Sequence, residues 1–168
     1  MEFKYFLALS GWILALVQFT FTHLEGRRKN EAELLEKSLS YFERGTQARS
    51  IGISLVEGIW VKRKKYLDVI TPIIISQVIF LLTEADDYAQ EKANLIRLLN
   101  LLEKCLPHAS DFMWENHEIS YALIDAARKP GSIILEKETL RHWFSRLNGG
   151  NAELFDIETE NSESRDKT

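Results

Sequence analysis

The chain opens with an uninterrupted apolar run, and the segments after it alternate apolar and polar positions at helical spacing. The run extends from Tyr5 to Leu24 and contains no Asp, Glu, Lys or Arg. A helix needs about 20 apolar residues to cross a bilayer, a length that this segment just reaches. The run therefore predicts a transmembrane anchor. Phe3, Tyr5 and Phe6 lie at one end of the run and Phe19 and Phe21 near the other, as aromatic residues at a membrane interface do.

Two other interpretations of this run are weaker. A cleaved signal peptide would carry small residues before the cut, where this chain has Phe19, Phe21, His23 and Leu24. A buried helix of a small domain would need cover on almost every face. Thr20 and Thr22 dilute the second half, but their hydroxyls can hydrogen-bond back to helix carbonyls.

The flanking charges predict an orientation for this anchor. Only Lys4, offset by Glu2, precedes the run, whereas Arg27, Arg28 and Lys29 follow it. Positive charge accumulates on the cytoplasmic side of membrane proteins. We therefore expect a single-pass protein of the bacterial inner membrane, with the bilayer as one partner and a cytoplasmic C-terminal domain.

Apolar residues recur at helical spacing between residues 30 and 148, which predicts an all-α domain there. Asn30 can cap a helix that ends near Phe42, and Thr46 can cap a second one. In that second helix the predicted apolar stripe is Ala48, Ile51, Leu55, Ile59 and Trp60. Four more helices are expected to begin at Thr71 with Pro72 next, at Asp86 or Asp87, at Ser110 or Asp111, and at Glu136, the last ending at Leu147.

The run from Ile70 to Leu82 allows three interpretations. It covers about 13 residues, which is too short for a second membrane crossing. Its β-branched residues, Ile73, Ile75 and Ile79 among them, are also typical of a strand. We expect a buried helix. A membrane-disrupting effector, in which this helix joins the anchor in the bilayer, stays an alternative.

The last residues, 149–168, are acidic and serine-containing, and no large apolar residue follows Ile157. This composition predicts a disordered tail. The expected organisation is therefore an anchor with its basic flank at 1–29, a helical domain at 30–148 and the acidic tail at 149–168.

Charge and cysteine content narrow the function classes. The net charge of -4 argues against nucleic-acid binding, and the single cysteine, Cys105, excludes an internal disulfide. A second basic stretch consists of Lys62, Arg63, Lys64 and Lys65. It is a small footprint for nucleic-acid binding. It suits anionic lipid head groups, to which each charge near the surface contributes about 1 kcal/mol of binding free energy.

The stretch R-x-x-G-I-x-x-V-E, with Arg49, Gly52 and Glu57, precedes the apolar run from Ile70. This order resembles the N-terminal membrane-anchored region of bacterial pentapeptide-repeat proteins. It is also similar to a HEAT-type helical hairpin, in which small residues let two helices pack closely. The pentapeptide repeats are missing, apart from one unit-like stretch at Ala152–Phe155. The resemblance implies a helical architecture and a docking role, and it brings no catalytic residue.

The side chains that could take part in catalysis or metal binding lie close together in the sequence, between Cys105 and His117. Cys105 could act as a nucleophile with His108 as base, and metal-capable side chains follow at Asp111, Glu115 and His117. The spacing matches no zinc-protease pattern, and no glycine-rich phosphate loop exists. We therefore expect no metal, cofactor or catalytic residue.

The prediction for function is a membrane-tethered helical adaptor that binds a partner protein. The alternative is a membrane-associated effector or hydrolase with a site near Cys105–His117. Arg49 lies on an otherwise small and apolar helix face, so we expect it to pair with Glu57 or with a carboxylate on the next helix. Contact with a partner is its alternative role.

Overall fold

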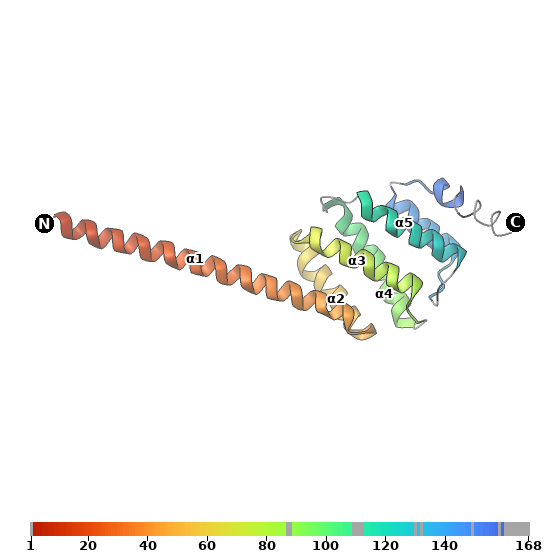
Figure 1. Ribbon diagram of the computed structural model, residues 1–168, viewed down its shortest axis with the longest axis horizontal. Helices are drawn as coiled ribbons and strands as arrows, with labels where there is room; N and C mark the ends of the chain where they lie inside the picture. The colour runs from red at the N-terminus through yellow and green to blue at the C-terminus, as the bar shows by residue number, and fades with distance from the viewer. Residues whose placement is uncertain are drawn as a thin grey trace. The chain divides into compact units, whose positions relative to one another are not determined.

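A computed structural model describes residues 2–86, 89–108, 113–129, 131, 133–148, 150–157 and 159, and the side chains of all of these except 2–11, 13, 15 and 113–117. The chain divides into two compact units, Met1–Ser38 and Leu39–Thr168. The first consists of most of one long helix, and the second contains the remaining helices (Figure 1).

The first helix, α1 (Glu2–Ser40), runs for 39 residues without a break. Asn30 therefore does not start a separate helix, and Gly26 lies inside α1. The hydroxyls of Thr20 and Thr22 bond back to the carbonyls of Val17 and Gln18, at 2.8 and 2.9 Å, as expected.

The prediction of a membrane anchor is wrong. Across the part of the chain that the structure describes, no helix combines the length and apolar character needed to cross a membrane. Gln18, Thr20 and Thr22 dilute the second half of the Tyr5–Leu24 run, and charged residues follow it from Glu25 onward in the same helix. The predicted single-pass location in the inner membrane, with a cytoplasmic C-terminal domain, depends on this anchor and is therefore wrong as well.

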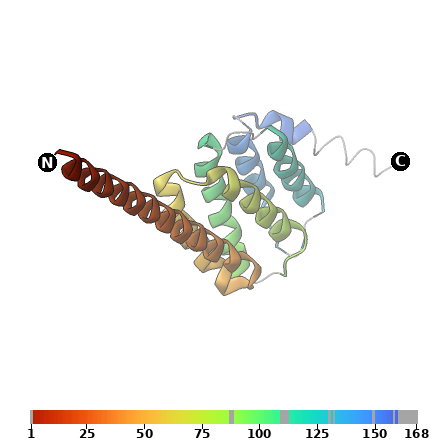
Figure 2. The same cartoon turned by 60° about the vertical axis from the view of Figure 1, so that its left-hand side comes forward.

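The second unit is built from helices packed side by side (Figure 2). The helix α3 packs against both α4 and α5, α2 packs against α4, and α6 packs against α5. No residue within the described ranges forms a strand, so the all-α prediction is confirmed, also for Ile70–Leu82. The elements are η1 (Tyr41–Glu43), α2 (Thr46–Leu55), the π-helical η2 (Val56–Val61), α3 (Leu67–Thr83), α4 (Ala89–Cys105), η3 (Leu106–His108), α5 (Met113–Arg128) and α6 (Lys137–Leu147).

The core of this unit lies where α3 meets α4. Eight residues of α3 are buried, including Ile70, Ile74 and Val78, and α4 buries Leu95, Leu98 and further leucines. Removing this much apolar surface from water is the main stabilisation that a domain of this size has available. The predicted hairpin of α2 on α3 differs from this arrangement, because the principal neighbour of α2 is α4.

The buried face of α2 and η2 is rotated from the predicted one. The buried residues are Arg49, Gly52, Ile53, Val56 and Trp60, whereas Ile51 is 50% exposed. Of the predicted apolar stripe, Trp60 is buried as expected, whereas Ala48, Ile51 and Leu55 are not fully buried. Arg49 instead points into the domain, where a carboxylate neutralises it.

The start of α3 also differs from the prediction. The helix begins at Leu67, after Tyr66 in a left-handed conformation with φ 58°. Thr71 is therefore not a cap, and its hydroxyl donates to the carbonyl of Leu67 at 2.7 Å. Lys64 has a φ of 52°, so two residues of this basic connection adopt backbone angles that side chains other than glycine rarely take.

Part of the predicted disordered tail belongs to the second unit. Phe155 is fully buried, and its ring lies 5.4 Å from that of Phe144 on α6. Arg141 forms an ion pair with Asp156 at 2.9 Å. The prediction of disorder is therefore wrong for residues 151–157, and residues 161–168 lie outside the described part of the chain.

Candidate functional site

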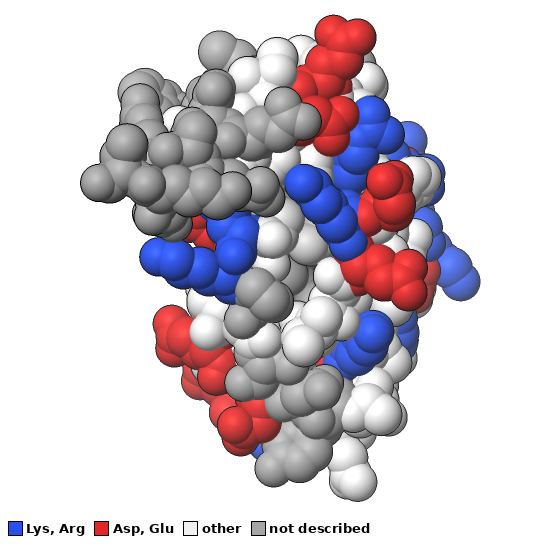
Figure 3. Space-filling model, turned by 90° about the vertical axis from the view of Figure 1, so that its right-hand side faces the viewer, with Lys and Arg blue, Asp and Glu red and all other residues white. Residues whose placement is uncertain are grey.

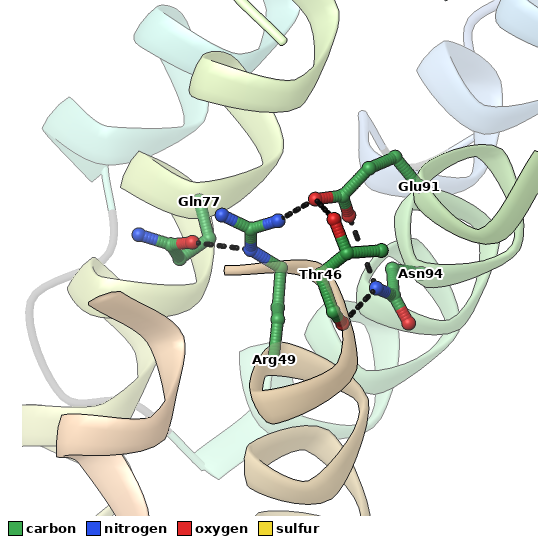
Figure 4. A network of polar contacts seen from close by, with 5 residues as sticks. All are labelled: Thr46, Arg49, Gln77, Glu91 and Asn94. Atoms are coloured by element: carbon green, nitrogen blue, oxygen red, sulfur yellow. Dashed lines mark hydrogen bonds and ion pairs between the residues drawn. The ribbon is translucent and has the colours of Figure 1, made fainter. Parts of the chain in front are cut away.

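Arg49 lies at the centre of a buried polar network that joins three helices (Figure 4). Its side chain, on α2, donates a charged hydrogen bond to the carboxylate of Glu91 on α4. Its Nε donates to Oε1 of Gln77 on α3 at 3.0 Å, and its guanidinium lies 5.4 Å from the ring centre of Phe80, also on α3. One side chain thus connects α2 to both of the helices that form the core.

The carboxylate of Glu91 is held by further donors. The Thr46 hydroxyl donates to Oε1 at 2.8 Å, and Nδ2 of Asn94 donates to Oε2 at 3.0 Å and to the carbonyl of Thr46 at 3.0 Å. Burial raises the pKa of Glu91, but the hydrogen bonds from Arg49, Asn94 and Thr46 outweigh it, so the pKa lies below its ordinary value. The predicted capping role of Thr46 is wrong: Gly45 is the N-cap, and Thr46 is the first residue of α2 and donates its hydroxyl to Glu91.

The network is structural, because its charges satisfy each other inside the domain. A buried ion pair whose two charges neutralise each other has no net charge left over for a substrate. The predicted ion pair of Arg49 therefore exists, but its partner is neither Glu57 nor a residue of the next helix. Glu57 instead pairs with Lys104 at 2.6 Å in a partly exposed position, and that hydrogen bond lowers the pKa of Glu57 despite partial burial.

A groove of about 330 Å³ runs along α3, on a side of the helix that the core leaves open. It is lined by Pro72, Ile75, Ser76, Ile79, Phe80, Glu84 and Glu118. Between Asp68 and Glu84 the helix carries no charged residue. Phe80 is shared with the polar network, since the Arg49 guanidinium covers its ring. The network therefore helps to fix one wall of the groove.

The basic stretch Lys62, Arg63, Lys64 and Lys65 forms the connection from η2 to α3, with all four side chains exposed. The other basic group, Arg27, Arg28 and Lys29, is exposed on α1 in the first unit. These two groups belong to different units of the chain.

The region around Cys105, which was the alternative reactive site, lies only partly within the described residues. Cys105 is fully buried, and burial raises the pKa of its thiol to about 11 despite a hydrogen bond with Thr71. His108 is exposed at the end of η3. Asp111 and the side chains of Glu115 and His117 lie outside the described residues. Within those that are described, no three His, Cys, Asp or Glu side chains gather as metal ligands would.

No known protein family, curated protein or solved structure matches this chain. The resemblance to the membrane-anchored region of pentapeptide-repeat proteins therefore stays a prediction.

Sequence reasoning missed the groove and three members of the network, Gln77, Glu91 and Asn94. Glu91 and Gln77 lie far from Arg49 along the chain, and nothing local to Arg49 indicates them. The groove did leave a signal, because Pro72, Ser76 and Phe80 recur at helical spacing within a stretch without charge. That signal was interpreted as the mark of a helix buried on all sides.

Proposed function

We propose that the second unit is a helical adaptor that binds a helical segment of a partner protein along α3. The observation that carries this proposal is the groove on α3, whose apolar lining residues are Pro72, Ile75, Ile79 and Phe80. The helix carries no charged residue from Val69 to Thr83, and Pro72, Ile79 and Phe80 are half-buried. Amphipathic helices bind into apolar grooves of this kind through side chains spaced three and four residues apart.

The contacts that hold α3 in the domain suit its proposed role as a docking surface. Eight side chains of α3 are buried in the core, and Arg49 links the helix to α2 and α4. A rigid groove binds a partner without the cost of ordering its own residues. We further propose that the domain uses its layered helices as HEAT-type proteins do, as a fixed support for a docking surface.

The membrane-disrupting alternative fits this surface less well. Glu84 and Glu118 line the groove and are exposed. A carboxylate is costly to bring into hydrocarbon, whereas a partner protein can offer it a hydrogen-bond donor. The other sides of α3 are occupied by the domain core, so insertion would also require the domain to open.

Site-specific photo-crosslinking tests the proposal. A photoreactive amino acid at Ser76, which is exposed in the groove, should form a covalent adduct with one protein in the source cell. The control position is Tyr121 on α5, which is 62% exposed and does not line the groove. Ile79→Lys, placed in the Ser76 variant, should abolish the adduct while circular dichroism shows an unchanged helix content. Equal adducts at both positions, or none at Ser76, would contradict the proposal.

A further inference from the structure

The groove carries two carboxylates whose charge is not compensated within the described part of the domain. Glu84 follows the last residue of α3, and Glu118 lies on α5. Both side chains line the groove and are exposed, and neither forms an ion pair with a described residue. Asp86 adds a third exposed carboxylate just beyond Glu84.

Several acidic side chains elsewhere on the domain are paired with basic ones. Arg146 contacts Glu103 at 2.5 Å, Arg141 contacts Asp156 at 2.9 Å, and Lys104 contacts Glu57 at 2.6 Å. On the face that Figure 3 shows, Lys and Arg side chains lie next to Asp and Glu side chains. The groove is different, because it combines apolar lining with negative charge alone.

The dimensions of the groove set the size of what binds there. Glu84 lies twelve positions after Pro72, just beyond the end of α3, and a rise of about 1.5 Å per residue places them up to about 18 Å apart. A bound helix would need about three turns to cover this length. Its side chains at positions i, i+3, i+4 and i+7 would face Ile75, Ile79 and Phe80.

We propose that the partner helix is basic and amphipathic, with an apolar stripe flanked by lysine or arginine. This inference rests on the proposed function and names the chemistry of the partner. The apolar stripe packs on α3 and covers the groove floor. The flanking cations donate charged hydrogen bonds to Glu84 and Glu118, which otherwise would lose water without gaining a partner. The same carboxylates repel an acidic helix, so they select between partners.

Two synthetic peptides test this. Each has 18 residues, as a design choice of about five helical turns, and the same leucine and alanine stripe. One carries lysine at the flanking positions and the other glutamate. Binding to the full chain is measured by fluorescence anisotropy. We expect the lysine peptide to bind at least about tenfold more tightly than the glutamate peptide, with an affinity that falls as salt rises.

Charge variants distinguish binding of the lysine peptide at the groove from its general electrostatic attraction to an acidic protein. The double variant Glu84→Gln and Glu118→Gln should lower affinity for the lysine peptide several-fold, and Glu84→Lys with Glu118→Lys should favour the glutamate peptide. The matched control is Glu153→Gln, which removes an exposed carboxylate outside the groove and should change nothing. An equal loss with Glu153→Gln would overturn the proposal.

The failures of the two proposals are distinguishable. If both peptides bind equally and Ile79→Lys blocks both, the groove binds helices but does not select basic ones, and this inference fails alone. If neither peptide binds and Ser76 forms no adduct, the proposed function fails as well. If the chain is a dimer that Glu84→Lys dissociates, a second copy occupies the groove and the inference is overturned.

Discussion

The guanidinium of Arg49 and the carboxylate of Glu91 form a buried ion pair between α2 and α4, although 42 residues separate them along the chain. Both side chains are only 6% exposed. Their charges are acceptable inside the domain because each is neutralised by the other. In addition, Gln77 accepts a hydrogen bond from Arg49, and Thr46 and Asn94 donate hydrogen bonds to Glu91. The pair decides which face of α2 points inward.

Removing Arg49 should be strongly destabilising. Arg49→Met keeps the length of the side chain but leaves Glu91 buried without its counter-charge, which costs about 3–5 kcal/mol. Urea unfolding of the full chain, followed by circular dichroism, measures the loss. The control is Lys104→Met, which breaks the partly exposed pair with Glu57 and should cost at most about 1 kcal/mol. Equal losses would show that burial of the Arg49 pair has no energetic consequence.

Stability should fall in acid through Glu91. Its pKa in the folded protein lies below the ordinary 4.5, so the unfolded chain binds the proton more readily than the folded one. The stabilisation is therefore complete above pH 4.5 and is lost as the pH falls through the folded value. The urea midpoint should drop over this range.

Glu91→Gln supplies the control for this pH dependence. The amide cannot titrate, so the variant should start from a lower stability and lose less of it in acid. Glu57 also makes the protein less stable in acid, since its pKa in the folded protein is lowered as well. Lys104→Met removes the hydrogen bond that lowers this pKa and so measures how much of the pH dependence comes from Glu57. A Glu91→Gln profile parallel to that of the parent would contradict the assignment.

Gly52 and Gly58 provide a matched pair in one continuous helical segment. Gly52 is buried on α2, whereas Gly58 is exposed on η2 and a side chain there would meet nothing within 4 Å. Gly52→Leu should overpack the interior and cost about 1–3 kcal/mol. Gly58→Leu should be neutral or slightly stabilising, because leucine is the better helix former by roughly 1 kcal/mol. Urea unfolding that ranks the two variants in the opposite order would place Gly52 in open space.

Gly131 should not tolerate even alanine. A Cβ atom at this position would lie 2.4 Å from the carbonyl oxygen of Leu82 at the end of α3. Because the obstacle is backbone, Gly131→Ala must push the loop away from α3, at a cost of about 1–3 kcal/mol. Thermal unfolding should show a lowered midpoint, and amide exchange should rise at the end of α3. An unchanged midpoint would mean that the loop moves aside freely.

Cys105 should be unreactive in the folded protein. Its thiol is fully buried, and its pKa of about 11 keeps the nucleophilic thiolate scarce at neutral pH. Iodoacetamide should label Cys105 slowly in the native chain and completely in urea, as mass spectrometry can follow. Rapid labelling of the native chain would revive the enzyme hypothesis for this region.

The amino-acid sequence by itself determined the helical class and the elements whose boundaries depend on local signals. The last helix was predicted from Glu136 to Leu147 and is observed from Lys137 to Leu147, because its cap, apolar spacing and terminating glycines are all local. The helix containing Ile74 and Val78 was likewise predicted from its apolar run, although its start at Leu67 was not.

Only the tertiary structure decided what depends on distant neighbours. Arg49 turns inward and Ile51 outward because Glu91 on α4 supplies the counter-charge, which no pattern within α2 reveals. Phe155 orders part of the tail because Phe144 offers it a buried surface. The groove exists because the helices around α3 cover most of its circumference and leave one side open. Periodicity shows how a helix repeats, whereas burial depends on which helices are close enough to cover it.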